Sequence, residues 1–155
     1  MKAPADSSPQ TWHRFFAASA NNMAWTLAEL PADELDANAL LDAAHAAAWH
    51  WQHAGSEINR MRSHTLLALA HARAGLGTTA LAYADEIRTY FLKREGTPDW
   101  EIAMTHVVHA CAAAAAGDKA QHAVSYAEGA RALAAITRDE DRDVVKRVLA
   151  HVPPP

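Results

Sequence analysis

One pattern occurs twice in this 155-residue chain, about 42 positions apart, and it constrains the fold more than any other feature. The first copy begins at Ala74-Gly75 and the second at Ala116-Gly117. In each copy a glycine separates two alanine-rich stretches whose apolar residues recur at helical spacing. Because glycine readily ends one helix and lets the chain turn into the next, the pattern indicates helical hairpins. Stacked hairpins of this kind usually form binding scaffolds.

The composition favours helices and excludes several classes of protein. Half of the residues are hydrophobic, six are glycine, and the net charge is −4 with histidine neutral. Lys and Arg total 14 and form no stripe with interleaved aromatics, so we expect no nucleic-acid partner. The lone Cys111 has no partner for an internal disulfide, which suits a reducing cytoplasm. Because no signal-peptide pattern and no uncharged apolar run of about 18 residues is present, we expect a soluble cytoplasmic protein without a membrane span.

Capping residues, prolines and glycines divide the chain into seven expected helices. Ser8-Pro9 and Thr97-Pro98 each place a capping hydroxyl before a proline, and proline is favoured in the first helical turn. Ser56, Thr78 and Asp118 follow glycines and are expected to cap the next helices. The expected helices span residues 9–29, 32 or 33–54, 56–74, 78–95, 97–117, 118–136 and 137–151. Residues 1–8 would form a flexible lead, 9–152 a single helical-repeat domain, and 153–155 a proline tail.

The first six helices should pair into three antiparallel hairpins, and the seventh should cap the stack with a charged outer face. The run from Gly75 to Ala84 resembles the turn and second helix of a tetratricopeptide repeat. Residues 40–152 resemble a family of small uncharacterised bacterial tetratricopeptide-like proteins, through segment 45–51, Gly55, Asn59 and Arg62. The resemblance implies an all-α, tetratricopeptide-like stack of three antiparallel helix hairpins plus a C-terminal capping helix. It implies no particular activity.

Two histidine pairs are candidates for a metal site. His50 and His53 are three residues apart in one expected helix, and His106 and His109 repeat that spacing in another. This spacing places both imidazoles of a pair on one helix face, within reach of a single ion. A zinc or nickel site needs at least three ligands, and neither pair has an acidic residue at a spacing that completes the set. The alternative interpretation is that these histidines pack between helices or lie on the surface.

The expected hairpin around Gly55 is the preferred binding site. Folding back at this glycine would place His50 opposite Asn59 and Arg62, and His45 opposite His64. Imidazole, amide, guanidinium and indole groups together can hold a carboxylate or phosphate. The alternative is that the indoles fill gaps between helices and the polar groups satisfy one another. The contacts we expect are His45, His50, Trp51, Asn59 and Arg62.

A groove on the first helices of the three hairpins is a further candidate. A shift of 42 residues maps His64 onto His106, so both would line the same concave surface. Mixed polar and apolar walls of this kind suit a peptide or a partner helix. The alternative is ordinary packing between hairpins.

These patterns favour binding over catalysis. No Gly-x-Ser-x-Gly elbow is present, and Cys111 lies in an apolar run that is expected to be buried. We therefore predict a non-enzymatic scaffold that uses no cofactor, binds a protein or peptide partner and can form a homodimer. The alternative function is a histidine-cluster protein that binds a metal or a small molecule, with weak hydrolytic activity.

Overall fold

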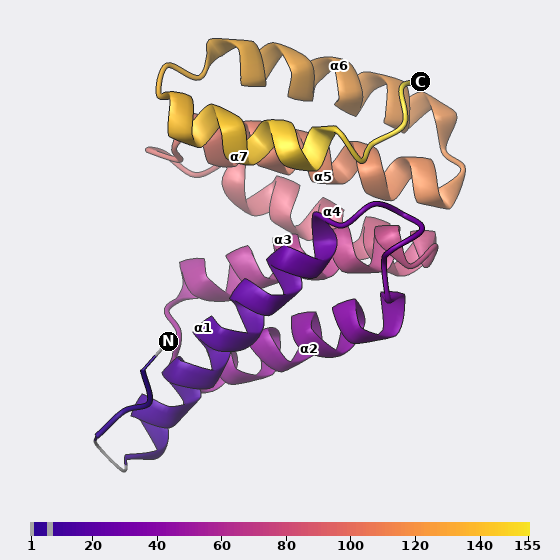
Figure 1. Ribbon diagram of the computed structural model, residues 1–155. Coiled ribbons are helices and arrows are strands. Elements are labelled where there is room, and N and C mark those ends of the chain that lie inside the picture. Colours follow the sequence, from indigo (N-terminus) through magenta and orange to yellow (C-terminus); the bar gives the residue numbers. More distant parts are fainter. Residues whose placement is uncertain (1, 6–7) are drawn as a thin grey trace.

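The computed structural model describes residues 2–5 and 8–155, and these residues form seven helices and no strand. The all-α prediction is confirmed (Figure 1). The predicted lead, residues 1–8, lies partly outside the described residues. The helices are α1 (Pro9–Ala28), α2 (Ala37–Ala54), α3 (Glu57–Arg73), α4 (Gly77–Phe91), α5 (Asp99–Ala116), α6 (Lys119–Ala135) and α7 (Asp139–Leu149).

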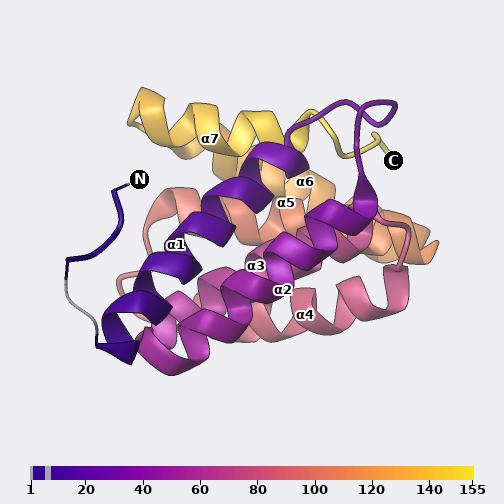
Figure 2. The same ribbon diagram turned by 60° about the horizontal axis from the view of Figure 1, so that its bottom comes forward.

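The helices stack as consecutive antiparallel neighbours. Figure 1 shows α1 and α2 at one end, α6 and α7 at the other, and α3, α4 and α5 between them. The first helices of the three hairpins lie side by side, since α3 contacts both α1 and α5. Helix α7 packs on α5 and α6, and its Val145 and Val148 are buried. Figure 2 shows the course of α7 along the stack. The predicted stack with a terminal helix is therefore confirmed.

The two glycine-marked turns have the same backbone conformation. Gly75 and Gly117 each have a φ of 74°, the left-handed region that glycine enters without strain. After α3, the amide of Leu76 donates to the carbonyl of His71 at 2.8 Å. After α5, the amide of Asp118 donates to the carbonyl of Ala113 at 3.0 Å. Both turns are thus Schellman caps, and the doubled sequence pattern is a doubled structure.

Several predicted helix starts are wrong by a few residues. Helix α2 begins at Ala37, because the side chain of Asp36 accepts hydrogen bonds from the amides of residues 38 and 39. Helix α4 begins at Gly77 rather than after a Thr78 cap. Helix α7 follows Arg138, and no side chain caps it. The caps predicted at Ser8 and Asp118 are confirmed, by bonds from the amides of Thr11 and Gln121.

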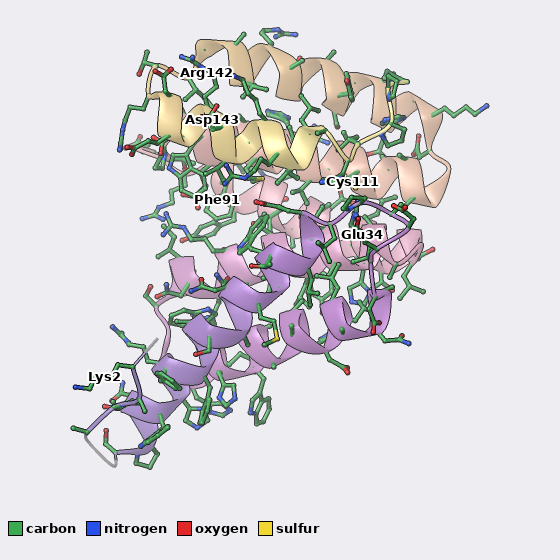
Figure 3. All side chains as sticks on the ribbon, viewed as in Figure 1. Lys2, Glu34, Phe91, Cys111, Arg142 and Asp143 are labelled. Carbon is green, nitrogen blue, oxygen red and sulfur yellow. The ribbon has the colours of Figure 1, made fainter. Side chains whose placement is uncertain are left out.

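The core is built from small side chains and lies around α3 and α5. Helix α5 is apolar nearly all round, which is typical of a helix buried on several sides. Phe91 and Cys111 lie in the interior, whereas Lys2 and Asp143 are exposed (Figure 3). Burial raises the pKa of the Cys111 thiol to about 11, so the thiol stays protonated at neutral pH. Among the described residues, no helix is long and apolar enough to span a membrane.

The proline tail is attached to α6. Its first carbonyl, that of Pro153, accepts a hydrogen bond from Nε2 of His122 at 2.9 Å. The imidazole of His122 is 7% exposed, so the bond is largely screened from water. This contact holds the C-terminal segment beside the end of α5 and the start of α6.

Candidate functional site

The hairpin of α2 and α3 does not assemble the predicted site. His50 lies against α1, where its Nδ1 is 2.9 Å from Nδ1 of His13, and it does not face Asn59 or Arg62. Asn59 instead caps α3, accepting hydrogen bonds from the amide and hydroxyl of Ser56. Trp51 lies beside the same turn, because a Cβ added to Gly55 would come within 3.0 Å of its ring. The prediction failed because α1 covers the face of α2 that was assigned to α3.

The pairing predicted for His45 is also wrong. Its Nε2 lies 3.2 Å from Nε2 of His71, about two helical turns beyond His64, the residue that was expected. The ring of His71 stacks on Tyr83 of α4 with centroids 5.8 Å apart. His64 reaches α4 as well, with its Nδ1 2.8 Å from a carboxylate oxygen of Glu86. His64 therefore does not face the groove where it was predicted.

His109 is the centre of a buried hydrogen-bond network. Its Nδ1 is 2.8 Å from the hydroxyl of Ser125 on α6, and its Nε2 is 3.1 Å from Asp85 on α4. The arrangement has the composition of a Ser-His-Asp triad, but the Ser125 side chain is buried at 1% exposure. A substrate has no access to such a hydroxyl. The network joins α4, α5 and α6. Nη1 of Arg88 on α4 is also part of it and lies 3.3 Å from Nε2 of His109.

The two predicted metal pairs lie in different surroundings. His50 and His53 gather with His13, whose ring centroid is 4.6 Å from that of His53. His106 is half-buried on α5, and no described residue bonds to its Nδ1. Burial is the main cause that lowers the pKa of both His106 and His109. In the described part of the chain, no three His, Cys, Asp or Glu side chains are grouped so that they could hold a metal ion.

Arg62, the remaining predicted contact, lies in a different site. Its Nε and Nη2 donate to the two carboxylate oxygens of Glu101 on α5, at 2.6 and 3.1 Å. The Glu101 side chain is only 4% exposed, whereas that of Arg62 is 43% exposed. Hydrogen bonding to this carboxylate raises the pKa of Arg62. The guanidinium also lies over the Trp100 ring, 5.4 Å from its centroid, so three interactions orient it.

A pocket of about 310 Å³ opens beside this ion pair. It lies among α1, α3, α5 and α7. The groove was predicted on the first helices of the hairpins, but His64 and His106, which were expected to line it, do not line this pocket. Trp25, Trp100, Met104 and Val144 supply apolar surface to it. Its lining residues are Asn21, Trp25 and Glu29 from α1 and its cap, Arg62 and Thr65 from α3, Trp100, Glu101 and Met104 from α5, and Val144 and Arg147 from α7.

A second ion pair crosses the pocket between the two ends of the chain. Nε of Arg147 on α7 donates to a carboxylate oxygen of Glu29 at 3.0 Å. The two side chains are 51% and 32% exposed, so this pair contributes little to stability. It does place a second guanidinium, that of Arg147 on α7, at the same pocket as the guanidinium of Arg62 on α3. The pocket therefore combines apolar walls with two arginines and two carboxylates.

The sequence analysis named three of the four helices that line the pocket, but it placed the groove on the His64 and His106 faces of α3 and α5. Arg62, which was predicted for the hairpin site, is the one predicted contact that lines the pocket. The pocket residues of α1 recur every four positions, at Asn21, Trp25 and Glu29, which is the spacing of one helix face. That spacing and the two tryptophans were available signals. The contribution of α7 was not, because a terminal helix predicted only as a solvated cap gives no indication of what it covers.

Comparison with known proteins finds no match, whether to a family model, a curated protein or a solved structure. Fold and pocket together define the class: an all-α stack of helical hairpins with a partly apolar pocket on the face of its first helices. The resemblance to tetratricopeptide proteins remains a prediction.

Proposed function

We propose that the protein is a non-enzymatic, tetratricopeptide-like module of the bacterial cytoplasm that binds a protein or peptide partner. The observation that carries the proposal is the pocket among α1, α3, α5 and α7. It lies on the face where the first helices of stacked hairpins come together, and repeat proteins of this architecture use such extended faces for binding. A bound segment would lie along this face and insert one large apolar side chain.

The dimensions and chemistry of the pocket suit such an anchor. A volume of about 310 Å³ is at the lower end of the range for ligand sites, roughly 300–1,000 Å³. Indole and thioether walls give an inserted side chain a desolvated environment, which is where binding energy concentrates in interfaces. The ion pairs Arg62–Glu101 and Arg147–Glu29 provide the polar rim that surrounds an anchor of this kind.

Filling the pocket should abolish partner binding. Val144 is half-buried in the wall formed by α7, so Val144→Trp would place an indole in the cavity. The matched control is Val124→Trp on α6, because Val124 is 58% exposed and does not line this pocket. We expect a displayed random-peptide library to yield peptides that wild type and Val124→Trp retain. Val144→Trp should bind them at least tenfold more weakly in a fluorescence-polarisation titration.

Two outcomes contradict this proposal. One is a library that yields no enriched sequence on the wild-type protein. The other is a set of peptides that Val144→Trp binds as tightly as Val124→Trp does. Circular dichroism of all three proteins ensures that a loss of binding is not a loss of folding.

A homodimer is part of the proposal and is supported by a separate surface. Trp49 and Phe16 are large apolar side chains that are 58% and 43% exposed at the α1–α2 end of the stack. Self-association would cover this open end. We expect wild type to be a dimer by light scattering and Trp49→Ala to be a monomer. A monomeric wild type at high micromolar concentration contradicts this part.

A second candidate function is the binding of a small molecule in the same pocket. It is favoured by the four helices that surround the pocket and by the two guanidinium groups that line it. A site built on rigid helices, with apolar walls and few polar groups, is the usual form of a small-molecule site. The histidine clusters do not enter this candidate, since none of the ten histidines lines the pocket.

A further inference from the structure

The two arginines of the pocket retain unused hydrogen-bond donors. Arg62 gives its Nε and Nη2 groups to Glu101, and its Nη1 group has no partner among the described residues. Arg147 gives only its Nε group to Glu29, so within the described chain both of its Nη groups are unpaired. A guanidinium carries five N–H donors in a fixed plane, and its strongest partners are carboxylate and phosphate groups.

We infer that the ligand of this pocket carries a carboxylate beside a compact aromatic body, as a small aromatic acid does. This inference rests on the second candidate function, the binding of a small molecule in this pocket. The aromatic body would lie among Trp25, Trp100, Met104 and Val144. The carboxylate would bind the unused donors of Arg62 and Arg147.

The unused hydrogen-bond donors and the burial of Glu101 favour an anion over a cation at this pocket. The four charged groups form two neutral pairs, Arg62 with Glu101 and Arg147 with Glu29. Glu101 is 4% exposed under Arg62, so a cationic ligand would have to displace the arginine to reach it. An anionic ligand displaces nothing, because it binds edges of the guanidinium groups that the carboxylates leave unused. The cation–π contact with Trp100 holds Arg62 in place for this role.

The volume of the pocket limits the ligand to a small one. About 310 Å³ accommodates a bicyclic aromatic ring with a short acidic arm, and it excludes a long chain or a nucleotide that must be fully enclosed. Both indoles can contact a flat ring, since aromatic groups pack well edge-to-face or offset. The inferred ligand class is therefore an aromatic monocarboxylic acid.

A matched pair of probes tests the inference directly. 2-Naphthylacetate and 2-naphthylacetamide have the same ring and nearly the same shape, and they differ in one charge. We expect isothermal titration at 50 mM salt to give the acid a dissociation constant on the order of 1 mM or lower. The amide should bind at least fivefold more weakly. The difference should shrink at 500 mM salt, because exposed charges are then screened.

Two variants assign the preference to the arginines. Arg147→Gln should bring the acid to the affinity of the amide, whereas Arg131→Gln should leave the preference intact. Arg131 is the matched control, because it forms a comparable exposed pair with Glu128 on α6, away from the pocket. Arg62 is tested as Arg62→Gln/Glu101→Gln, so that no buried carboxylate is left unpaired. That double variant should also reduce the preference for the acid.

Failure of the inference and failure of the proposed site give different results. If both probes bind equally and Val144→Trp abolishes both, the pocket is a binding site and the inference about the carboxylate is wrong. If neither probe binds at millimolar concentration while Val144→Trp still weakens the library peptides, the inference is wrong and the peptide proposal stands. A preference for the acid that survives both arginine variants overturns the inference as well.

Discussion

Replacing Gly77 with alanine should destabilise the protein by about 2–3 kcal/mol, the largest effect we expect from adding one methyl group. A Cβ at this position would come within 2.3–2.4 Å of backbone atoms of Ala115 and Ala116. Such distances cannot be relieved by a rotamer change, so α4 and α5 would have to move apart. The helix propensity of alanine opposes this loss by only about 1 kcal/mol. The clash therefore outweighs the gain in helix propensity, and the variant should be less stable than wild type. Thermal unfolding should show a midpoint lower by about 5–10 °C.

The control for this substitution is Gly96→Ala. Gly96 is exposed, has a φ of 73°, and has no heavy atom within 4 Å of the added Cβ. Its alanine variant therefore suffers only the backbone cost of the left-handed region, about 1 kcal/mol. If Gly77→Ala were as stable as Gly96→Ala, the close approach of the α4 start to the α5 end would be wrong.

The result bears on the origin of the doubled sequence pattern. Gly77 belongs to the first copy, and Ala116, which it meets, belongs to the second. The two copies are therefore not only alike in conformation but in contact with each other. The small residues at these turns are needed because two helix ends approach within backbone distance, and not only because helices must end there.

Acidification should produce the second large effect, a loss of stability between pH 7.5 and pH 5. Burial lowers the pKa of His50, His71, His106 and His109 in the folded protein. The unfolded chain keeps the ordinary value of about 6.5, so below that pH it binds more protons than the folded chain does. Stability is thus complete above about pH 6.5 and is lost as the pH falls. We expect the free energy of unfolding to drop on the order of 2 kcal/mol in urea titrations.

The contacts of these histidines explain why the protonated forms are disfavoured. The rings of His13 and His50 meet nitrogen to nitrogen at 2.9 Å, and those of His45 and His71 meet at 3.2 Å. In each pair one nitrogen must donate and the other must accept, which two protonated rings cannot do. The charge of the neighbouring ring adds to the effect of burial at both His50 and His71.

His50→Gln isolates the contribution of one pair. His50 is only half-buried, so its glutamine variant should fold, and its stability should depend less steeply on pH between 7.5 and 5. His151→Gln is the comparison, because the ring of His151 makes no hydrogen bond within the described residues. A pH dependence that is unchanged in His50→Gln, or absent in wild type, would contradict the assignment.

Most of the fold could be predicted from the sequence, because the signals that set it are local. Ser8, Asp118 and the glycines at 75 and 117 act on neighbours within four or five residues, and the structure confirms all of them. The start of α2 was misplaced because two acidic residues, Asp33 and Asp36, both suit a cap. The start of α4 was misplaced because Gly77 was assigned to the turn, when close packing requires it inside the helix.

The candidate site could be predicted only in part. Arg62 was selected for its chemistry, and it does lie in the pocket, but with Glu101 and Trp100 rather than with His50 and Asn59. The histidines were selected for their three-residue spacing and their places in the expected hairpin and groove, whereas the structure places them in pairs and networks between helices. A residue type indicates which chemistry is available, whereas its partners depend on the helices that pack against it.

The sequence by itself determined the seven helices, their turns and the hairpin order, since these depend on spacing and on capping by near neighbours. Only the tertiary structure decided that α1 covers the histidine face of α2, and that α7 crosses to Glu29 through Arg147. The physical reason is that helix faces are broad and nearly interchangeable when they are rich in alanine. Their pairing is settled by side-chain packing between segments as much as 118 residues apart, which no local pattern records.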